Sequence, residues 1–464
     1  MAAWRMAIYA LPAIPMAFLF VPLTALLPAF YAQELGVSLS AVGGFLLVSR
    51  LFDMGIDPGL GRLSDMTRSR WGRRKPWMVA ATPIVMLGAW MVFMPPLNAT
   101  GVHLLVATSV IYLGASMLGL AFSAWGAEVV ESYHGRSKIA GFREAANVLG
   151  IVIASAVPAV TGLYGHAVDR FTMSVMGWIV IAMTPLTVWA ALRFIPEPPA
   201  APHAPSPWAK TLSTLFRNKP FRLLCVAYVV LNIGASIANA TLVFFISHYL
   251  KQPEVIGPVL LASFGSVLVG VPLWVRIARR IGKHRAAGIS LFIAMSLSGV
   301  VAMQMQAGDG WLFVGLMSLC GLTSAAFLTL PLGIMGDIID YDALKTGEAR
   351  GGLFFGVWAF FQQISPAVAI GVTLPLLESL GFSAKGGNDA EALRALKYVY
   401  CLGPLPFMLA GAVMFMTFPI DARRHGIIRR RLDARAARLS PGAWRIEPSA
   451  ASLAAKPAPT PESP

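Results

Sequence analysis

The sequence predicts an all-α membrane protein with twelve transmembrane helices in two pseudo-symmetric bundles of six. Hydrophobic residues make up 56% of the 464 residues and charged residues only 13%, and the mean hydropathy is +0.67. Soluble chains carry about 25% charged residues, so most of this surface must face lipid. Apolar runs of membrane-spanning length recur along the chain, and a Pro- and Ala-rich segment divides them into two sets of six.

Each run contains about 20 mostly apolar residues, enough for a helix to cross a hydrocarbon core of about 30 Å. Backbone groups in lipid must bond within their own segment, so these runs predict helices. The expected spans of the first set are 8–31, 38–59, 77–96, 102–124, 141–164 and 171–194. Those of the second set are 220–248, 255–275, 286–306, 311–334, 352–377 and 396–418.

The predicted domains follow from this division of the chain. They are a first six-helix bundle at 1–196, a cytoplasmic linker at 197–219, a second six-helix bundle at 220–420 and a cytoplasmic tail at 421–464. The tail begins with a basic segment and continues as a Pro/Ala/Ser stretch that we expect to be disordered.

Composition and motifs exclude several classes of protein. A net charge of +15 would suit nucleic-acid binding on one basic domain, but the basic residues lie in short segments between apolar runs. Cys225, Cys320 and Cys401 form no CxxC pair and no disulfide framework. No histidine has metal-ligand spacing, and no HExxH, GxSxG or Walker motif occurs. We therefore expect no enzyme, no metal, no cofactor and no nucleic-acid partner.

The basic residues also predict the orientation in the membrane. They gather in the connections after the second and eighth spans, whereas those after the first, third and ninth spans hold none. The two groups are Arg62, Arg68, Arg70, Arg73, Arg74 and Lys75, and Arg276, Arg279, Arg280, Lys283 and Arg285. Cytoplasmic loops carry an excess of Lys and Arg. Both termini are therefore expected in the cytoplasm, and the chain in the cytoplasmic (inner) membrane.

The second span contains charges, which are costly in lipid and mark candidate functional sites. Arg50 lies three residues before Asp53, and Asp57 lies four after it, so all three share one helix stripe that must face the bundle interior. Two carboxylates one turn apart can hold a monovalent cation or share a proton. The alternative is a fixed Arg50–Asp53 ion pair that only joins helices. Pro58 and Gly59 predict a loosened backbone here.

Charged residues at helix ends predict gates at the inner surface. After the second span, Asp65 is placed to accept from helix N-terminal amides or to pair with Arg68, as a latch that breaks when the halves move. The alternative is a segment that only fixes topology. The other gating candidates are Glu128 after the fourth span, Asp337 and Asp340 after the tenth, and Arg350 beyond them.

Three segments carry a resemblance to a known family. They are RLFDMGIDPGLGRLSDMTRSRWGRRKPW, AEVVESYHGRSKIAGFRE and DIIDYDALKTGEARGGLFFGVW. Together they resemble the glycoside–pentoside–hexuronide:cation symporter family, the melibiose-permease group of the major facilitator superfamily, over roughly residues 5–420. The resemblance implies the major facilitator fold and transport by alternating access. It also implies that Asp53 and Asp57 are cation-site carboxylates and that Trp125 and Arg143 contact the sugar.

The sequence departs from that family at several site positions. Ile56 stands between the two acids of the second span where sodium-using relatives have a polar residue, and Leu118 supplies no ligand oxygen. Because a proton needs only one carboxylate, we expect proton rather than sodium coupling. Ala17 and Ala121 stand where the family has sugar-binding acids, and Gln363 replaces its lysine. These changes leave a transporter but weaken the prediction of a sugar.

The remaining polar and aromatic residues near the midplane predict the solute site. We expect the solute to contact Trp125, Arg143, Asn232, Trp358 and Gln363. For each residue singly, the alternative is helix packing, because polar side chains routinely bond across membrane helices.

The predicted function is secondary active symport of a small organic solute, sugar or glycoside-like by resemblance, driven by a cation that we expect to be a proton. One alternative is an amphipathic, lipid-like or aromatic solute. Another is a non-transporting membrane sensor or scaffold. A monomer in contact with membrane lipid is expected, since one chain supplies both halves.

Overall fold

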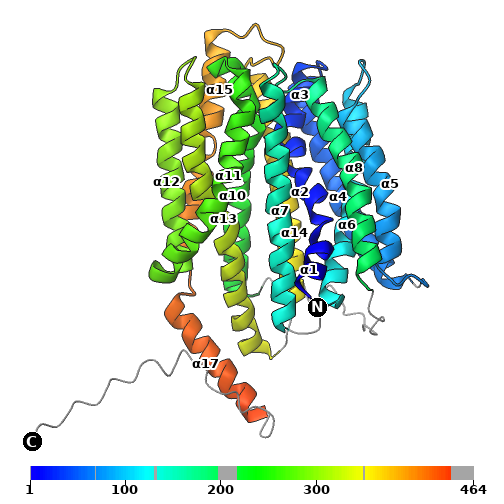
Figure 1. Cartoon of the computed structure of the whole chain (residues 1–464). Helices are drawn as coiled ribbons and strands as arrows, with labels where there is room; N and C mark the ends of the chain where they lie inside the picture. Colours follow the sequence, from blue (N-terminus) through cyan, green and yellow to red (C-terminus); the bar gives the residue numbers. More distant parts are fainter. Residues whose placement is uncertain (1, 68, 130–132, 197–216, 348–350, 440–464) are drawn as a thin grey trace, which may run out of the picture.

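The computed structural model describes residues 2–67, 69–129, 133–196, 217–347 and 351–439. Within these residues every regular element is a helix (Figure 1). Twelve of the helical segments described are long and apolar enough to cross a membrane. The predicted fold class, an all-α membrane protein with twelve spans, is confirmed.

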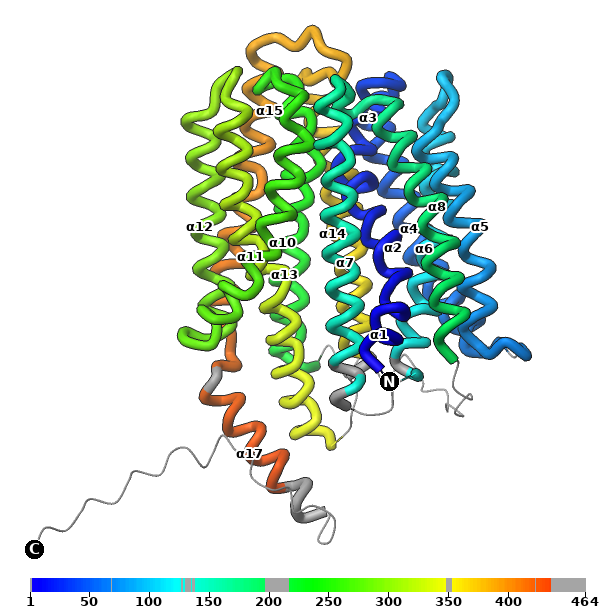
Figure 2. Tube along the Cα trace, viewed as in Figure 1, coloured from blue at the N-terminus to red at the C-terminus, as the bar shows by residue number. Residues whose placement is uncertain are grey.

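The first span is the most broken helix of the first bundle. It consists of α1 (Ala3–Ala10), α2 (Ala13–Phe18), a π-helical turn (Pro22–Leu26) and α3 (Leu27–Gln33). Prolines at these junctions lack the N–H that would continue the hydrogen-bond ladder. Figure 2 shows the segments rising as one column from the N-terminus at the lower end. The other spans of this half are α4 (Leu39–Met66), α5 (Lys75–Phe93), α6 (Gly101–Val129), α7 (Tyr133–Gly162) and α8 (Arg170–Phe194).

The second bundle repeats this order. It comprises α10 (Lys219–Phe244) with a π-helical end (Phe245–Leu250), a short turn (Pro253–Val255) leading into α11 (Ile256–Ile281), α12 (Lys283–Gln304), α13 (Gly310–Thr346), α14 (Gly351–Ser379), and α15 (Ala390–Leu402) with α16 (Leu405–Met416). The helix α17 (Ala422–Leu439) follows, at the same end of the molecule as the N-terminus (Figure 1). Residues 197–216 of the predicted linker and 440–464 of the predicted tail lie outside the described residues.

Several helices extend beyond their predicted spans. The helices α4 and α13 run on to Met66 and Thr346, beyond the apolar stretches, because charged residues end a hydropathy window without ending helical hydrogen bonding. The loosened backbone predicted at Pro58 and Gly59 is wrong, because Pro58 lies inside the continuous helix α4. Neighbouring helices make such prolines tolerable in membrane helices.

One apolar core joins both bundles at the end where α4 begins. It contains Phe30 and Val42 of the first half together with Phe244, Val259 and Leu374 of the second, all completely buried. Polar contacts also cross here: the Ser40 backbone N–H donates to Glu378 at 2.6 Å, and the side chains of Gln33 and His248 meet at 3.1 Å. We call this end of the molecule the sealed end.

At the opposite end the cores of the two halves are separate. One contains Tyr9, Met78 and Trp125 of the first half only, and the other contains residues such as Phe221 and Phe354 of the second half only. The connections rich in Arg and Lys, α4–α5 and α11–α12, lie at this end (Figure 1). We call it the basic end. The two halves therefore share one hydrophobic core at the sealed end and have separate hydrophobic cores at the basic end.

Glycines allow the close approach at the sealed end. A Cβ on Gly43 of α4 would lie 3.0 Å from the carbonyl oxygen of Ile370 on α14, and a Cβ on Gly371 would lie 2.8 Å from Leu47. In the pseudo-symmetric pair, a Cβ on Gly257 of α11 would overlap the backbone of Ala159 on α7. Nearer the basic end, no described atom lies within 4 Å of a Cβ built on the following glycines: Gly59, Gly61, Gly265 and Gly356.

The α7–α11 contact provides a test of this packing. We expect Gly257→Ala to lower the free energy of unfolding by about 1–3 kcal/mol, because the added methyl must displace the backbone of α7. Gly265→Ala, on the same helix with open space beside it, gains the same helix propensity without the clash. Titration of the detergent-solubilised protein with sodium dodecyl sulfate measures both. Equal stabilities of the two variants would contradict the close approach.

Candidate functional site

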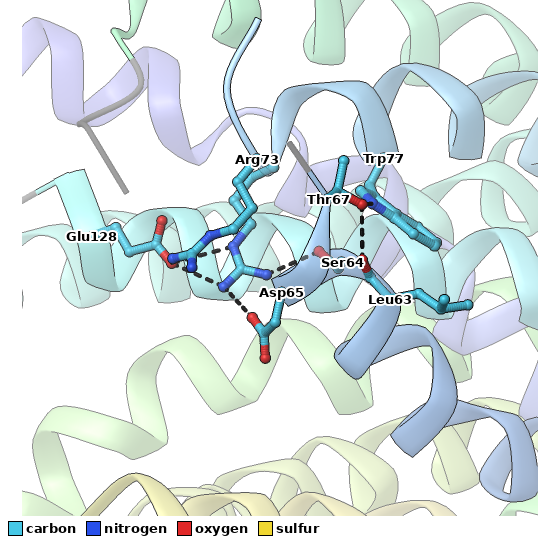
Figure 3. A network of polar contacts seen from close by, with 8 residues as sticks. Leu63, Ser64, Asp65, Thr67, Arg73, Trp77 and Glu128 are labelled. Carbon is cyan, nitrogen blue, oxygen red and sulfur yellow. Dashed lines mark hydrogen bonds and ion pairs between the residues drawn. The ribbon is translucent and has the colours of Figure 1, made fainter. Parts of the chain in front are cut away.

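An ion-pair cluster ties three helices of the first half together at the basic end (Figure 3). The Arg74 guanidinium lies 2.6 Å from Asp65 of α4 and 2.9 Å from Glu128 of α6, and Arg73 lies 2.6 Å from Glu128. Arg74 also donates to the hydroxyl of Ser64 at 2.9 Å and has only 6% of its side chain exposed. Asp65 is thus bound by Arg74. Its predicted partner Arg68 lies outside the described residues, as does Arg350.

A second cluster occupies the basic end of the other half. Lys283 at the start of α12 lies 2.7 Å from Asp337 of α13. His425 of α17 lies 3.0 Å from Asp340, and Arg429 lies 3.3 Å from the same carboxylate. The helix α17 is therefore fastened to the end of α13 by charge.

Asp421 caps the N-terminus of α17. The Arg424 backbone N–H donates to the Asp421 carboxylate at 2.7 Å. This hydrogen bond lowers the pKa of Asp421 below its ordinary value. The carboxylate therefore stays ionised at the N-terminus of α17, where negative charge is favoured.

Each cluster lies within a single half of the molecule, the first in the first half and the second in the second half. Of the ion pairs found between described residues at the basic end, each joins elements of the same bundle. They stiffen the ends of α4, α5 and α6, and of α12, α13 and α17. The gating roles of Asp65, Glu128, Asp337 and Asp340 stay predictions.

Asp53 is held entirely within the first half. Only 1% of its side chain is exposed. Arg50 donates to one carboxylate oxygen at 3.1 Å, and the hydroxyl of Ser116 on α6 donates to the other at 2.8 Å. The guanidinium of Arg50 also lies 4.1 Å from the centre of the Tyr112 ring, a cation–π geometry. Both oxygens of Asp53 are therefore engaged in joining α4 to α6.

Asp57 lies one helical turn further along α4 and faces the other half. The side-chain amide of Gln363 on α14 donates to its Oδ2 atom at 3.3 Å. Its Oδ1 atom is buried without a hydrogen-bond partner, and so is the Oε1 atom of Gln363. The two predicted coupling acids thus have different surroundings: Asp53 is saturated inside one bundle, and Asp57 has a spare oxygen where the bundles meet.

An aromatic cluster surrounds Trp125 in the first half. The Trp125 side chain is fully buried and meets Tyr9 edge-on at 5.6 Å between ring centres. Tyr9 stacks on Phe122 at 4.7 Å and donates its hydroxyl hydrogen to the Phe122 carbonyl. Lys75 lies over the Trp125 ring at 5.6 Å. Arg143 of α7 reaches Ser123 of α6 at 3.5 Å, so the structure brings Arg143 and Trp125 to the same stretch of α6.

A matching cluster surrounds Tyr228 in the second half. Tyr228 stacks on Phe327 at 5.4 Å and contacts Trp358 at 3.9 Å between ring centres. Gln362 donates to its hydroxyl at 3.0 Å, and Asn232 donates to its backbone carbonyl at 3.2 Å. The structure thus gathers the predicted residues Asn232 and Trp358 around one tyrosine, while Gln363 points to Asp57.

The two clusters occupy equivalent places in the two halves. The stacked pairs Tyr9–Phe122 and Tyr228–Phe327 join the first span to the fourth and the seventh to the tenth. Each cluster contains a tryptophan, Trp125 or Trp358, whose indole nitrogen is buried without a hydrogen-bond partner. Two donors are thereby left for an acceptor that the described residues do not supply. Tyr228 and Ser116 were missed at the sequence level. Tyr228 lies one helical turn before Asn232, which was its only signal, and Ser116 had no such signal from Leu118, which is two residues away.

Comparison with known proteins assigns the chain to a family. A family profile described as MFS/sugar transport protein matches residues 8–422. The chain belongs to this family. The predicted membership of the glycoside–pentoside–hexuronide:cation symporter group of the major facilitator superfamily is confirmed.

Relatives of this MFS transporter cover most of its length at low identity. The putative glycoside/cation symporter YagG of Escherichia coli is 23% identical, over 89% of this chain and 91% of its own. The sodium-dependent lysophosphatidylcholine symporter 1 of Xenopus tropicalis is 22% identical, over 86% and 81%. A crystal structure of a mutant form of the nucleoside transporter NupG has a TM-score of 0.66 at 15% identity, covering 90% of this chain and all of NupG.

The ion-pair cluster of the first half gives a prediction for the transporter. We expect Glu128→Gln to lower the free energy of unfolding by about 1–3 kcal/mol, because two largely buried guanidiniums lose a charged partner. Glu391→Gln is the matched control, since Glu391 is exposed in the first turn of α15 and should change stability by about 0.5 kcal/mol or less. Titration with sodium dodecyl sulfate compares them. A loss no larger in Glu128→Gln than in the control would show that the cluster contributes nothing.

Proposed function

We propose that this transporter is a proton-coupled symporter for a small organic solute, sugar or glycoside-like, that works by alternating access. The observation that carries the proposal is the buried, unpartnered Oδ1 atom of Asp57, located where α4 meets α14 of the other half. A carboxylate at that place can bind an ion and respond to movement of the two halves at once. Intramembrane acids of this kind are functional sites by default.

The packing supports alternating access. The halves share one core at the sealed end and have separate cores at the basic end, as expected when one face of a central pathway is closed. We assign the basic end to the cytoplasm from its Arg- and Lys-rich connections. On this assignment the structure is the inward-facing state, and both described chain ends lie on the cytoplasmic side.

The surroundings of the two acids support a proton as the coupling ion. A sodium ion needs several oxygen ligands, as hard cations do. Both oxygens of Asp53 are already used by Arg50 and Ser116, and Leu118 is a buried apolar residue at the neighbouring position of α6. Asp57 alone suffices for a proton. We therefore assign coupling to Asp57, with Asp53 positioning α4 against α6.

The two aromatic clusters support an organic solute with hydrogen-bond acceptors. Trp125 and Trp358 each carry a buried indole N–H without a partner, and Arg143 adds a cation at Ser123 of the same helix as Trp125. A sugar or glycoside presents hydroxyl oxygens and an apolar ring face that suit such a lining. The relative YagG from Escherichia coli carries the name putative glycoside/cation symporter, which supports this class of cargo.

A second candidate is a lipid-like amphiphile. Ala121 is completely buried, and a Cβ on Gly150 of α7 would lie 3.1 Å from the Cβ of Ala17. The two positions where the resembled family binds sugar with acids are thus occupied by closely packed small residues. The named lysophosphatidylcholine symporter among the relatives favours the same alternative. Binding of a lysophospholipid but of no glycoside by the purified protein would select it.

Proton binding without solute tests the coupling site. We expect the wild-type protein, transferred between weakly buffered solutions of different pH, to bind about one proton more than Asp57→Asn. Asp53→Asn should keep that proton, because Asp57 is unchanged. Added sodium should leave the wild-type signal unchanged.

The same variants test transport. In proteoliposomes we expect Asp57→Asn to reduce pH-gradient-driven accumulation of the glycoside or amphiphile that binds by about tenfold or more. Identical proton binding in the wild type, Asp53→Asn and Asp57→Asn, with no flux through any of them, would instead favour the non-transporting sensor or scaffold.

A further inference from the structure

The contact between Asp57 and Gln363 is incomplete as a hydrogen-bonded pair. The amide nitrogen of Gln363 donates to Oδ2 of Asp57 at 3.3 Å. Beside this bond, Oδ1 of Asp57 and Oε1 of Gln363 are both buried without a partner. Both atoms are acceptors, and a buried acceptor without a donor is costly. The pair lacks one donor hydrogen.

One proton supplies that donor. A protonated carboxyl group has one O–H donor and one acceptor oxygen, and the glutamine amide has matching N–H donors and one acceptor oxygen. Protonated at Oδ1, Asp57 donates to Oε1 of Gln363 while its Oδ2 atom still accepts from the amide nitrogen. The two side chains then form a closed acid–amide pair with two hydrogen bonds, and both buried oxygens are satisfied.

This pair sits at the end of the seam between α4 and α14. Starting from the sealed end, the seam runs through the bond from Ser40 to Glu378, the packing of Gly43 on Leu374 and that of Leu47 on Gly371. Among the described residues, the Asp57–Gln363 bond is the polar contact of this seam nearest the basic end. Beyond it, Cβ atoms built on Gly59, Gly61 and Gly356 would have no described atom within 4 Å.

We propose that the proton on Asp57 is a bolt between the two halves: it completes the acid–amide pair with Gln363 and holds the sealed end closed until the proton leaves. This inference rests on the proposed function and deepens it. Loss of the proton breaks the O–H···Oε1 bond and leaves a buried carboxylate beside an unpartnered amide oxygen. The halves then part more easily at the sealed end. The inward-facing carrier therefore cannot return outward while it still carries its proton.

The charged groups near Asp57 are engaged elsewhere, so its hydrogen-bond partner across the seam is Gln363. On its own helix Asp57 faces Asp53 and Arg50, which are paired with each other. On α6 the titratable neighbour is Tyr112, which packs against Arg50. On α14, residues 353–377 contain no acidic or basic side chain, and Glu378 lies at the sealed end bound to Ser40. The partner of Asp57 across the seam is thus the neutral amide of Gln363. This amide can form two hydrogen bonds with Asp57 only when the carboxyl group is protonated.

The experiment measures the distance across the sealed end as a function of pH. Spin labels are placed on the full-length chain at Leu97 and Met303, which are 82% and 83% exposed near the sealed ends of opposite halves. The native residues Cys225, Cys320 and Cys401 are replaced by alanine. The protein is studied in lipid nanodiscs without solute, and proton binding is measured on the same samples.

In otherwise wild-type protein we expect the ratio of short to long distances to fall about tenfold between about pH 5 and about pH 9. Asp57→Asn should stay short at every pH, because its amide donates to Oε1 and accepts from the amide nitrogen of Gln363 as the protonated acid does. Gln363→Leu should lose the pH dependence. Gln362→Leu, which removes a neighbouring amide that bonds Tyr228 within its own half, should keep it.

Other outcomes overturn the bolt. Unchanged pH dependence in Gln363→Leu, or a pH-independent long distance in Asp57→Asn, would do so. The wild type could bind a proton that Asp57→Asn lacks while the distance between the spin labels does not change with pH. Asp57 would then remain the coupling site, and the bolt would be wrong. If sodium at constant pH closes the sealed end, the two oxygens hold a cation and the bolt is again wrong. If no proton is bound at Asp57, the proposed function fails as well.

Discussion

The close approach of two helix pairs at one end of the molecule determines the rest of the architecture. Helices α4 and α14, and α7 and α11, meet backbone to backbone because Gly43, Gly371 and Gly257 leave no side chain between them. This contact merges the cores of the two halves at the sealed end, while the basic end keeps two cores. In lipid, helix association is stabilised mainly by van der Waals packing. Small residues at the seam therefore allow the two halves to associate closely at this end.

The polar groups divide according to their position relative to that seam. The carboxylates inside one half find their partners within that half: Asp53 is bound by Arg50 and Ser116, and the ion pairs of the basic end join helices of a single bundle. The pair on the α4–α14 seam, Asp57 and Gln363, retains unused hydrogen-bonding capacity. This distribution fits two stiff bodies that move against each other, because strong electrostatic contacts hold each body and an adjustable one lies between them.

The aromatic clusters do not follow this division, because each has an unpaired donor inside its own half. The stacked pairs Tyr9–Phe122 and Tyr228–Phe327 repeat in the two halves, each beside a tryptophan with a free indole N–H. A solute that accepts hydrogen bonds from both tryptophans would contact both halves. Asp57 and the solute would then respond to the same relative motion, which is the physical requirement for coupling an ion gradient to transport. The family profile and the named relatives agree with a transporter.

The sequence by itself determined the twelve spans, their division into two sets of six and the family, because hydropathy over about 20 residues and three charged segments are local patterns. It also placed Asp53 and Asp57 on one stripe of α4, since helical spacing is local as well. Only the tertiary structure decided that Asp53 is bound by Ser116, that Asp65 pairs with Arg74 and that Asp57 faces Gln363, 306 positions away. Those partners come from other helices, and their proximity depends on how glycines let the helices pack, which no local pattern encodes.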